Sequence, residues 1–307
     1  MQRGEQKDHS CFQDINLRLK AKALGLAAED YTTGKVQNIS SLYTGKTIIE
    51  DVDANMINLL YEKGYCQPEE LLGGNVPLKN HYYILKSGKK SALAYFNSLN
   101  GMVEHVEKKS VYGVKPRNAE QTFAIHAVSK PEIKLVSLSG IAGTGKTLIA
   151  LAAALDQKRE FKQIYLARPI VPLSNKDIGY LPGDIKSKVN PYMEPLWDNL
   201  KFIQNQYNET DKEYSKITEM VTQEKLVITP LAYIRGRSLS NICFIVDEAL
   251  NLTPHEVKTI ITRAGEGTKI IFTGDIHQID TPYLDSQSNG LSPPIDRLKG
   301  PRALRPP

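Results

Sequence analysis

The sequence has few cysteines and no long apolar run, and each absence excludes a class of protein. Its three cysteines, Cys11, Cys66 and Cys243, are widely separated and show no C-x-x-C spacing. Neither a disulfide framework nor a cysteine-based zinc site is therefore expected. The longest apolar run, Leu148–Leu155, is too short to cross a bilayer, and the first residues contain no signal-peptide core. We expect a soluble, cytoplasmic protein.

Charge and composition restrict the function only weakly. The net charge of +5 is small for 307 residues, and the basic side chains are dispersed among many acidic ones. This balance is consistent with a polyanionic partner but does not by itself indicate one. We find no internal repeat and no long low-complexity tract. The length suits one large domain with a smaller companion.

The first third of the chain predicts a small, mostly helical region. The stretch Gln13–Asn100 reads as helices joined by tyrosine-rich connections. Leucines at helical spacing predict a helix over Asn16–Leu24, which Gly25 would terminate. The basic stretch Glu107–Arg117 ends in a Lys-Pro pair, which is typical of a linker. A second domain is expected to follow it.

That second domain shows short β-branched apolar runs that alternate with longer segments of helical character. Continuous apolar strands separated by helices predict a parallel sheet covered on both faces. The fold class is therefore α/β, and ligands should bind at the carboxyl ends of the strands. The predicted strands are Ile133–Ser139, Gln163–Ala167, Leu226–Thr229, Ile242–Val246 and Lys269–Thr273.

The pattern G-x-x-x-x-G-K-T predicts a phosphate-binding loop that takes ATP with Mg²⁺. It follows a predicted strand and opens an apolar helix, which is the context that this motif requires. Lys146 should reach the β- and γ-phosphates, and the Thr147 hydroxyl should bind Mg²⁺. The alternative is a glycine-rich turn without a ligand. The loop consists of Gly140, Ile141, Ala142, Gly143, Thr144, Gly145, Lys146 and Thr147.

A second G-K-T, at Gly45–Thr47, does not predict such a loop. The position that should carry the first glycine is Ser40, and Ile48–Val52 after it predicts a strand rather than a helix. We therefore reject it as a phosphate site.

Two acidic residues follow the predicted strand Ile242–Val246. We expect Asp247 to hold Mg²⁺ through water and Glu248 to orient or deprotonate the attacking water. A solvated strand end is the alternative. The next strand leads to Gln278, our candidate sensor of the γ-phosphate, with Asp275 beside it. The alternative there is a Gly-Asp turn with a surface glutamine.

A capping box at Thr253–Glu256, with proline at the first helical position, predicts a helix that runs to about Ala264. His255 is expected to be a solvated residue of its first turn rather than a ligand. This helix separates the two strands that carry the acidic pair and Gln278.

At this point the sequence resembles the PhoH-like ATPases over about Lys115–Gly300. The resemblance implies a RecA-like P-loop fold related to superfamily 1 helicases, ATP hydrolysis that acts on RNA as in an RNA helicase, and ring assembly, usually hexameric. It places the ATPase domain at residues 118–300, before a disordered tail at 301–307. Besides the phosphate loop, the matching motifs are Ala167–Pro169, Asp177–Gly183, Tyr233–Ser238, Val246–Ala249 and Thr273–Asp280.

By the same resemblance, Asn118–Gln121 is similar to the adenine-contacting Q motif, with Gln121 reading the base. The alternative is an N-cap Asn118 before an exposed helix face. Arg168, Arg235 and Arg237 resemble positions that face RNA or a neighbouring subunit's nucleotide; the alternative is a solvated charge. Arg263 is a further candidate for an arginine that acts on the γ-phosphate in trans.

The sequence departs from the family pattern at three places. Leu250 stands where the acidic motif usually has glutamine, and leucine cannot hydrogen-bond phosphate or water. The proline-rich tail is unsuited to the closing strand and basic motif of the family's domain. Residues 1–106 look like the later half of a PIN domain, a Mg²⁺-dependent ribonuclease fold, with Asp14 and Asp30 as carboxylates. The half with the first aspartate is absent, so we expect no nuclease activity.

Three functions compete. The leading hypothesis is an ATPase that moves or unwinds RNA through attack of water on the γ-phosphate. The second is a nucleotide-gated RNA-binding module without productive hydrolysis. The third, a small-molecule P-loop kinase, is disfavoured because Asp247, Glu248 and Gln278 together indicate water as the acceptor.

Overall fold

The structure is a computed structural model. It describes residues 43–171, 190–234, 236, 239–275 and 289–292, and the backbone alone of 10–12, 28–30 and 185–189. The predicted helix over residues 16–24, the proline-rich tail and the positions Asp14, Arg235, Arg237 and Gln278 lie outside the described residues. Asp30 ends the short strand β2 (Ala28–Asp30), which pairs in parallel with β1 (Ser10–Phe12).

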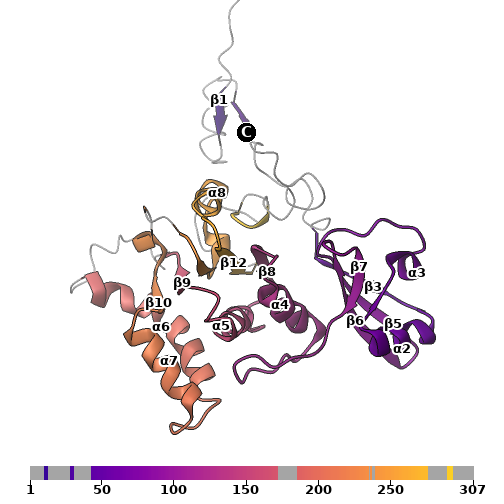
Figure 1. The fold of residues 1–307 in the computed structure, drawn as a ribbon. Helices are drawn as coiled ribbons and strands as arrows, with labels where there is room; N and C mark the ends of the chain where they lie inside the picture. The colour runs from indigo at the N-terminus through magenta and orange to yellow at the C-terminus, as the bar shows by residue number, and fades with distance from the viewer. Residues whose placement is uncertain are drawn as a thin grey trace, which may run out of the picture.

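The larger sheet is five-stranded and parallel throughout, in the order β10-β9-β11-β12-β8 (Figure 1). All five predicted strands are present, and their ends agree with the predicted ones to within about two residues. This confirms the α/β fold class of a P-loop NTPase. The strands are β8 (Leu135–Ser139), β9 (Gln163–Arg168), β10 (Leu226–Pro230), β11 (Ile242–Val246) and β12 (Lys269–Gly274).

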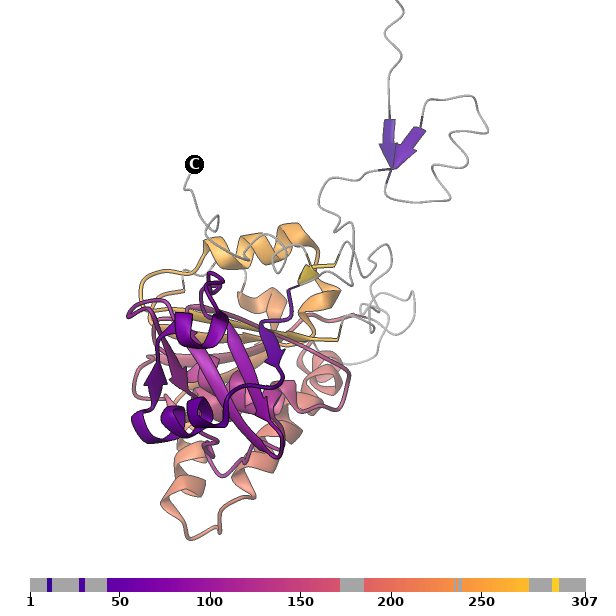
Figure 2. The same cartoon turned by 90° about the vertical axis from the view of Figure 1, so that its right-hand side faces the viewer.

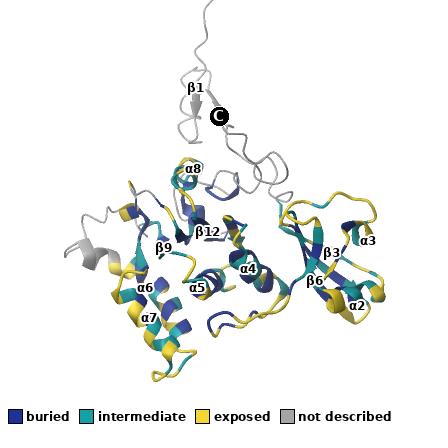
Figure 3. Ribbon diagram, viewed as in Figure 1, coloured by how far each residue is buried: buried dark blue, intermediate teal, exposed yellow. Residues whose placement is uncertain are grey.

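Successive residues of a strand point to opposite faces of the sheet, and helices cover both faces here. In β9, Leu166 belongs to the core under one set of helices, whereas Tyr165 belongs to the core on the other face. The first set is α4 (Ala119–Ser129), α5 (Lys146–Asp156), α6 (Ile185–Gln204) and α7 (Lys212–Thr222). The second is α8 (Pro254–Thr262) with the 3₁₀ turns η3 (Leu231–Ile234) and η4 (Ala249–Asn251). Buried residues accordingly concentrate in the strands and in α5 (Figure 3).

Residues 43–105 form a second, mixed sheet, so the prediction of a mostly helical region was wrong for this part. Its strand order is β3-β5-β6-β7-β4, and only β3 and β5 pair in parallel. The strands are β3 (Lys46–Ile49), β4 (Tyr65–Cys66), β5 (Tyr82–Ser87), β6 (Lys90–Asn97) and β7 (Met102–His105), with helices α2 (Ala54–Lys63) and α3 (Pro68–Leu72). The strand β3 confirms that the second G-K-T does not open a helix.

The physical reason for the wrong prediction is that β4 has only two residues and that the tyrosines of β5 and β6 were read as connections between helices. Tyr83 and Leu85 of β5 pack in a core with α2, while Tyr82 joins the core of the larger domain. The hairpin between β5 and β6 turns at Gly88, whose φ is 55°. The Ser-Gly pair at this turn was the available sequence signal.

One face of the small sheet shares a core with the larger domain. Tyr82 and Tyr95 of the small sheet belong to the same buried cluster as Phe123 of α4 and the apolar residues of α5. Figure 2 views the molecule from the side of the small sheet, which lies against the larger domain. Within the described residues, no helix combines the length and the apolar content that a bilayer requires.

The segment predicted as a linker, residues 107–117, is packed rather than free. Val111 is fully buried and pairs with Val114 through an isolated bridge. Lys158, just after α5, donates to the Tyr112 hydroxyl at 2.9 Å, and its ammonium lies 4.4 Å from the centre of that ring. Gly113 has a φ of 79°, and a Cβ there would lie 2.6 Å from Cβ of Gln206. The connection is therefore packed against the larger domain.

Candidate functional site

The phosphate loop connects β8 to α5 at the carboxyl edge of the large sheet. Gly143 and Gly145 have φ of 75° and 80°, the left-handed region that glycine adopts without strain. Gly145 is the N-cap of α5, so the first amides of this helix point toward the loop. Residues 141–144 are exposed, and Ile141 has 69% of its surface accessible. The loop thus presents N–H groups and a helix N-terminus to solvent, an arrangement that suits an anion.

Lys146 places its ammonium against the loop itself. Its Nζ donates to the carbonyl of Gly140 at 2.8 Å and to that of Ile141 at 2.9 Å. Both bonds keep the positive charge beside the glycine-rich backbone, where phosphate oxygens would be bound.

The acidic residue that follows β11 contacts the threonine of the loop. The Thr147 hydroxyl donates to Oδ1 of Asp247 at 2.5 Å, and the Thr273 hydroxyl donates to the same oxygen at 2.6 Å. Asp247 is only 6% exposed. The structure therefore brings Thr147 and Asp247 together, although they are 100 residues apart in the chain. Thr273 had not been singled out in the sequence, because its contact depends on β12 lying next to β11.

Glu248 adopts a backbone conformation that is unusual for its residue type. Its φ of 51° and ψ of 40° are left-handed, which costs a non-glycine residue about 1–2 kcal/mol. Its Oε1 lies 3.5 Å from Nη2 of Arg168, at the end of β9. The ion pair places Arg168 at the same edge of the sheet as the acidic pair. Strain of this kind is concentrated at functional sites.

Asp275 links the end of β12 to the phosphate loop by a hydrogen bond. Its Oδ2 accepts a hydrogen bond from the amide of Ala142 at 2.7 Å, and the carboxylate is 4% exposed. The neighbouring Gly274 carbonyl accepts from the amide of Gly140 at 3.2 Å. The sequence had indicated Asp275 only as a companion of Gln278. Its contact with the loop could not be foreseen without the order of the strands.

Gln121 reaches the phosphate loop from the first turn of α4. Its Nε2 donates to the carbonyl of Thr144 at 3.0 Å, while its Oε1 accepts from the amide of Arg117 at 2.7 Å. Asn118 caps the helix by accepting from the amide of Gln121 at 2.8 Å. The two readings of this segment are therefore compatible: Asn118 is an N-cap, and the side chain of Gln121 lies at the loop.

Leu250 is fully buried in the core on the α8 side of the sheet and does not line the loop. A Cβ on Gly274 would lie 2.6 Å from Cδ1 of Leu250, so this side chain fills the space beside Gly274. The absence of a hydrogen-bonding group at position 250 is thus matched by an apolar environment.

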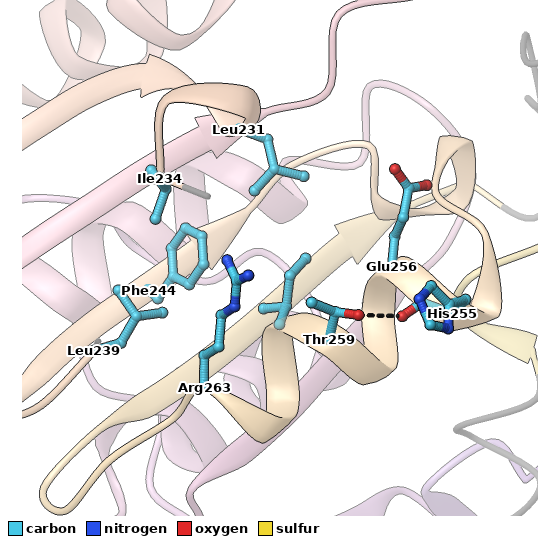
Figure 4. Close-up of a pocket in the computed structure, with 9 residues that line it drawn as sticks. Leu231, Ile234, Leu239, Phe244, His255, Glu256, Thr259 and Arg263 are labelled. Carbon is cyan, nitrogen blue, oxygen red and sulfur yellow. Dashed lines mark hydrogen bonds between the residues drawn. The ribbon is translucent and has the colours of Figure 1, made fainter. Parts of the chain in front are cut away.

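The capping box and the helix that it predicted are confirmed. Thr253 accepts from the amide of Glu256 at 3.2 Å, and Glu256 accepts from the amide of Thr253 at 3.0 Å. His255 is exposed on the first turn. It lines a cavity of about 230 Å³ between η3, β11 and α8, into which Arg263 extends its guanidinium group (Figure 4). No residue of the phosphate loop lines this cavity.

A metal ion at the loop would need ligands beyond the protein. Among the residues that the structure describes, no group of three or more His, Cys, Asp or Glu side chains could hold a metal. The pair formed by the Thr147 hydroxyl and the Asp247 carboxylate offers oxygen ligands, which Mg²⁺ prefers, but needs phosphate oxygens and water to complete six-fold coordination. The pair therefore fits a nucleotide-bound Mg²⁺ rather than a metal held by the protein alone.

A family model and several known proteins match this chain. The model of the family described as "PhoH-like protein" matches residues 113–305. The chain is 38% identical over 298 residues to Protein PhoH2 of Bacillus subtilis, covering 94% of this chain and 65% of that protein. It is 32% identical to Protein PhoH2 of Thermobispora bispora, covering 94% of this chain and 63% of that protein. A PhoH-like protein of Bacillus subtilis is 37% identical, covering 71% of this chain and 65% of that protein.

The chain spans less than two thirds of the length of these relatives. The matches to the two PhoH2 proteins include the small sheet, because they cover nearly the whole chain, whereas the family model begins at the segment before α4. Sequence similarity, the parallel sheet and the phosphate loop agree with one another, and they support nucleotide binding by a P-loop ATPase domain. The chain belongs to the PhoH family.

Proposed function

We propose that the chain binds ATP together with Mg²⁺ and hydrolyses it, with RNA as the partner on which the ATPase acts. The observation that carries this proposal is the 2.5 Å contact between Thr147 of the loop and Asp247 after β11, with Glu248 next in the chain. A phosphate loop, a buried carboxylate and a second carboxylate at one sheet edge are the parts that hydrolysis of a γ-phosphate needs.

Each of these residues has a role in the proposed reaction. The loop amides and Lys146 would bind the β- and γ-phosphates, and Thr147 and Asp247 would hold Mg²⁺. The bound ion would neutralise charge that develops on the phosphate oxygens. Glu248 would orient the attacking water and accept its proton. Gln278 remains our proposed sensor of the γ-phosphate.

Gln121 would select adenine. A carboxamide offers one donor and one acceptor, which match N7 and the N6 amino group of adenine. Its present partners, the Thr144 carbonyl and the Arg117 amide, are an acceptor and a donor of the same kinds. Adenine could therefore bind both groups of the carboxamide in their place.

RNA and ring assembly enter as proposals from the family resemblance. The net charge of +5 is compatible with a polyanion. In a ring, an arginine from a neighbouring copy would complete the site, and Arg235, Arg237 and Arg263 are the candidates. Arg263 would first have to leave the cavity in which its side chain lies.

A second candidate function is a nucleotide-gated RNA-binding module without productive hydrolysis. The ion pair between Arg168 and Glu248 favours it, because it engages the carboxylate that would have to orient the attacking water. The pair must open, or Arg168 must move to another anion, before Glu248 accepts a proton.

Phosphate release with and without RNA tests the proposal. The wild-type chain should release phosphate from ATP, and Lys146→Ala should lose both nucleotide binding and turnover. Glu248→Gln keeps the shape of the side chain and should retain ATP affinity while turnover falls by about 10²-fold or more. Lys162→Ala, at an exposed lysine before β9, is the matched control. ATP binding without any phosphate release by the wild type, together with RNA affinity that changes with ATP, would instead support the gated module.

A further inference from the structure

We propose that the small mixed sheet is a positioning element of the nucleotide site. It packs against α4, the helix whose first turn carries Gln121, and so determines the position at which that carboxamide meets the base. The inference rests on the proposed nucleotide binding and deepens it, because it assigns part of the base-dependent affinity to residues that touch no nucleotide.

The first step is the contact between α4 and the phosphate loop. Gln121 bridges the loop at Thr144 and the chain that enters the helix at Arg117. Its Nε2 also lies 3.6 Å from the place that a Cβ on Gly145 would occupy. The side chain is thus packed on the loop backbone, and a shift of α4 along or about its axis would displace it.

The second step is that the small sheet contacts one face of α4 at three levels, near the start, the middle and the end of the helix. Glu120, Phe123, His126 and Lys130 are spaced three or four residues apart, which places them on the same side of a helix. Lys46 of β3 forms an ion pair with Glu120, directly next to Gln121. Glu104 of β7 forms another with Lys130, at 3.2 Å, just beyond the last turn.

The middle level is a buried aromatic contact. The ring centres of Tyr82 and Phe123 are 4.6 Å apart, and those of Tyr95 and His126 are 4.9 Å apart. The Tyr82 hydroxyl is hydrogen-bonded to Nδ1 of His126 at 3.0 Å. Tyr95 is fully buried. Aromatic pairs at these distances stabilise a contact beyond the area that they bury, so this level fixes the helix most firmly.

The third step is that α4 is held from the opposite side as well. It packs on α5, the helix that begins with the lysine and threonine of the phosphate loop. The buried ammonium of Lys269 in β12 donates to the carbonyls of Val128 and Lys130 at the end of α4. The helix therefore lies between the two sheets, and the small sheet packs against one side of it.

This arrangement separates two parts of nucleotide affinity. The phosphate loop is built by the large sheet and α5, whereas the base contact depends on α4 and thus on the small sheet. Weakening the contact between the small sheet and α4 should therefore weaken binding of a nucleotide that presents adenine. It should leave binding of inorganic tripolyphosphate, which has no base, nearly unchanged.

Calorimetric titration of the full chain with ADP and with tripolyphosphate, both with Mg²⁺, tests the inference. Gln121→Ala should weaken ADP binding about tenfold, the value of one to two hydrogen bonds. Tyr82→Ala should weaken ADP binding by about three- to tenfold, and Tyr82→Phe, which keeps the ring, by about two- to threefold. Affinity for tripolyphosphate should change less than about twofold in each. The double variant Tyr82→Ala, Gln121→Ala should bind ADP no more weakly than Gln121→Ala alone.

Tyr83→Phe is the matched control, since Tyr83 is the neighbouring buried tyrosine of β5 but faces α2. It should leave both affinities unchanged. Equal losses for ADP and tripolyphosphate in both Tyr82 variants would show general damage and overturn the inference, as would unchanged ADP affinity in both. A wild-type chain that binds neither compound would overturn the proposed function itself, which is a distinguishable result.

Discussion

The two sheets of the molecule hold their polar residues in different places. In the large parallel sheet, polar side chains gather where strands end, as with Asp247 after β11 and Asp275 after β12. In the small mixed sheet they lie within the sheet's packed face, as with the hydroxyl of Tyr82 against His126. The first arrangement presents groups to a ligand, and the second fixes one element against another. In our proposal, a part of the chain without ligand-facing groups determines the geometry of the site.

The largest expected effect concerns the strand end. Asp247→Asn keeps an oxygen that can accept from Thr147 and Thr273 but removes the negative charge. We expect phosphate release to fall by about 10²-fold or more, with little change in melting temperature. Asp156→Asn, at the end of α5 and away from the site, is the control. Unchanged turnover in Asp247→Asn would show that this carboxylate takes no part in the reaction. The proposed contrast between the two sheets would then be wrong.

The next effect tests whether the two sheets unfold together. Leu166→Ala in β9 and Leu85→Ala in β5 each delete a fully buried side chain and should cost about 2–5 kcal/mol. Because Tyr82 and Tyr95 share the larger domain's core, each variant should shift one common transition in denaturant. Calorimetry or fluorescence that resolves two transitions, with Leu85→Ala moving only one of them, would show that the sheets are independent.

A smaller effect follows from His126 at the interface between the sheets. Burial, with Lys130 nearby, lowers the pKa of His126 to about 4, from an ordinary value of 6.5. The unfolded chain therefore binds a proton first, so stability is full above pH 6.5 and is lost as pH falls toward 4. The loss from this residue should reach up to about 3 kcal/mol.

Urea unfolding at several pH values measures this effect. His126→Gln should reduce the slope of stability against pH between 6.5 and 4. A residual slope is expected, because burial also lowers the pKa of His81 in the small sheet. A slope that is identical in the variant and the wild type would show that His126 is readily protonated in the folded protein.

The smallest effect is expected at the surface of the same interface. Lys46 and Glu120 form an ion pair in which the glutamate side chain is about half exposed, and exposed pairs contribute about 0–1 kcal/mol. Glu120→Gln should shift the melting temperature by no more than about 2–4 °C. A larger shift, absent in Glu50→Gln at the comparable pair with Lys86, would mean that the ion pair rather than the aromatic contact holds α4.

The sequence was sufficient to predict the large sheet but not the small one. Strands of a parallel sheet that are covered by helices read as continuous apolar runs between glycine and polar residues, and all five were found in this way. The strand predicted at Ile48–Val52 overlaps β3, but the two-residue β4 and the tyrosine-rich β5 give no such signal. The tyrosines of β5 and β6 are placed by their contacts with Phe123 and His126 of α4, which lies far along the chain.

The same limit applies within the candidate site. The phosphate loop and the acidic pair follow local patterns, so both could be named from the sequence. The bond between Asp275 and Ala142, the role of Thr273 and the ion pair of Arg168 with Glu248 all depend on strand order, which no local pattern encodes. Leu250 illustrates the opposite error: a missing polar group was noted, but the apolar environment around it was not foreseen.

Gly274 and Leu250 form a size-matched pair, and the pairing restricts how the sequence can vary. A methyl group on Gly274 would lie 2.6 Å from Leu250, and the Gly274 carbonyl also receives the amide of Gly140. An alanine at position 274 would thus require the Leu250 side chain to move or residue 250 to become smaller. We expect homologous sequences to change these two positions jointly, and an alignment of many relatives would reveal that covariation.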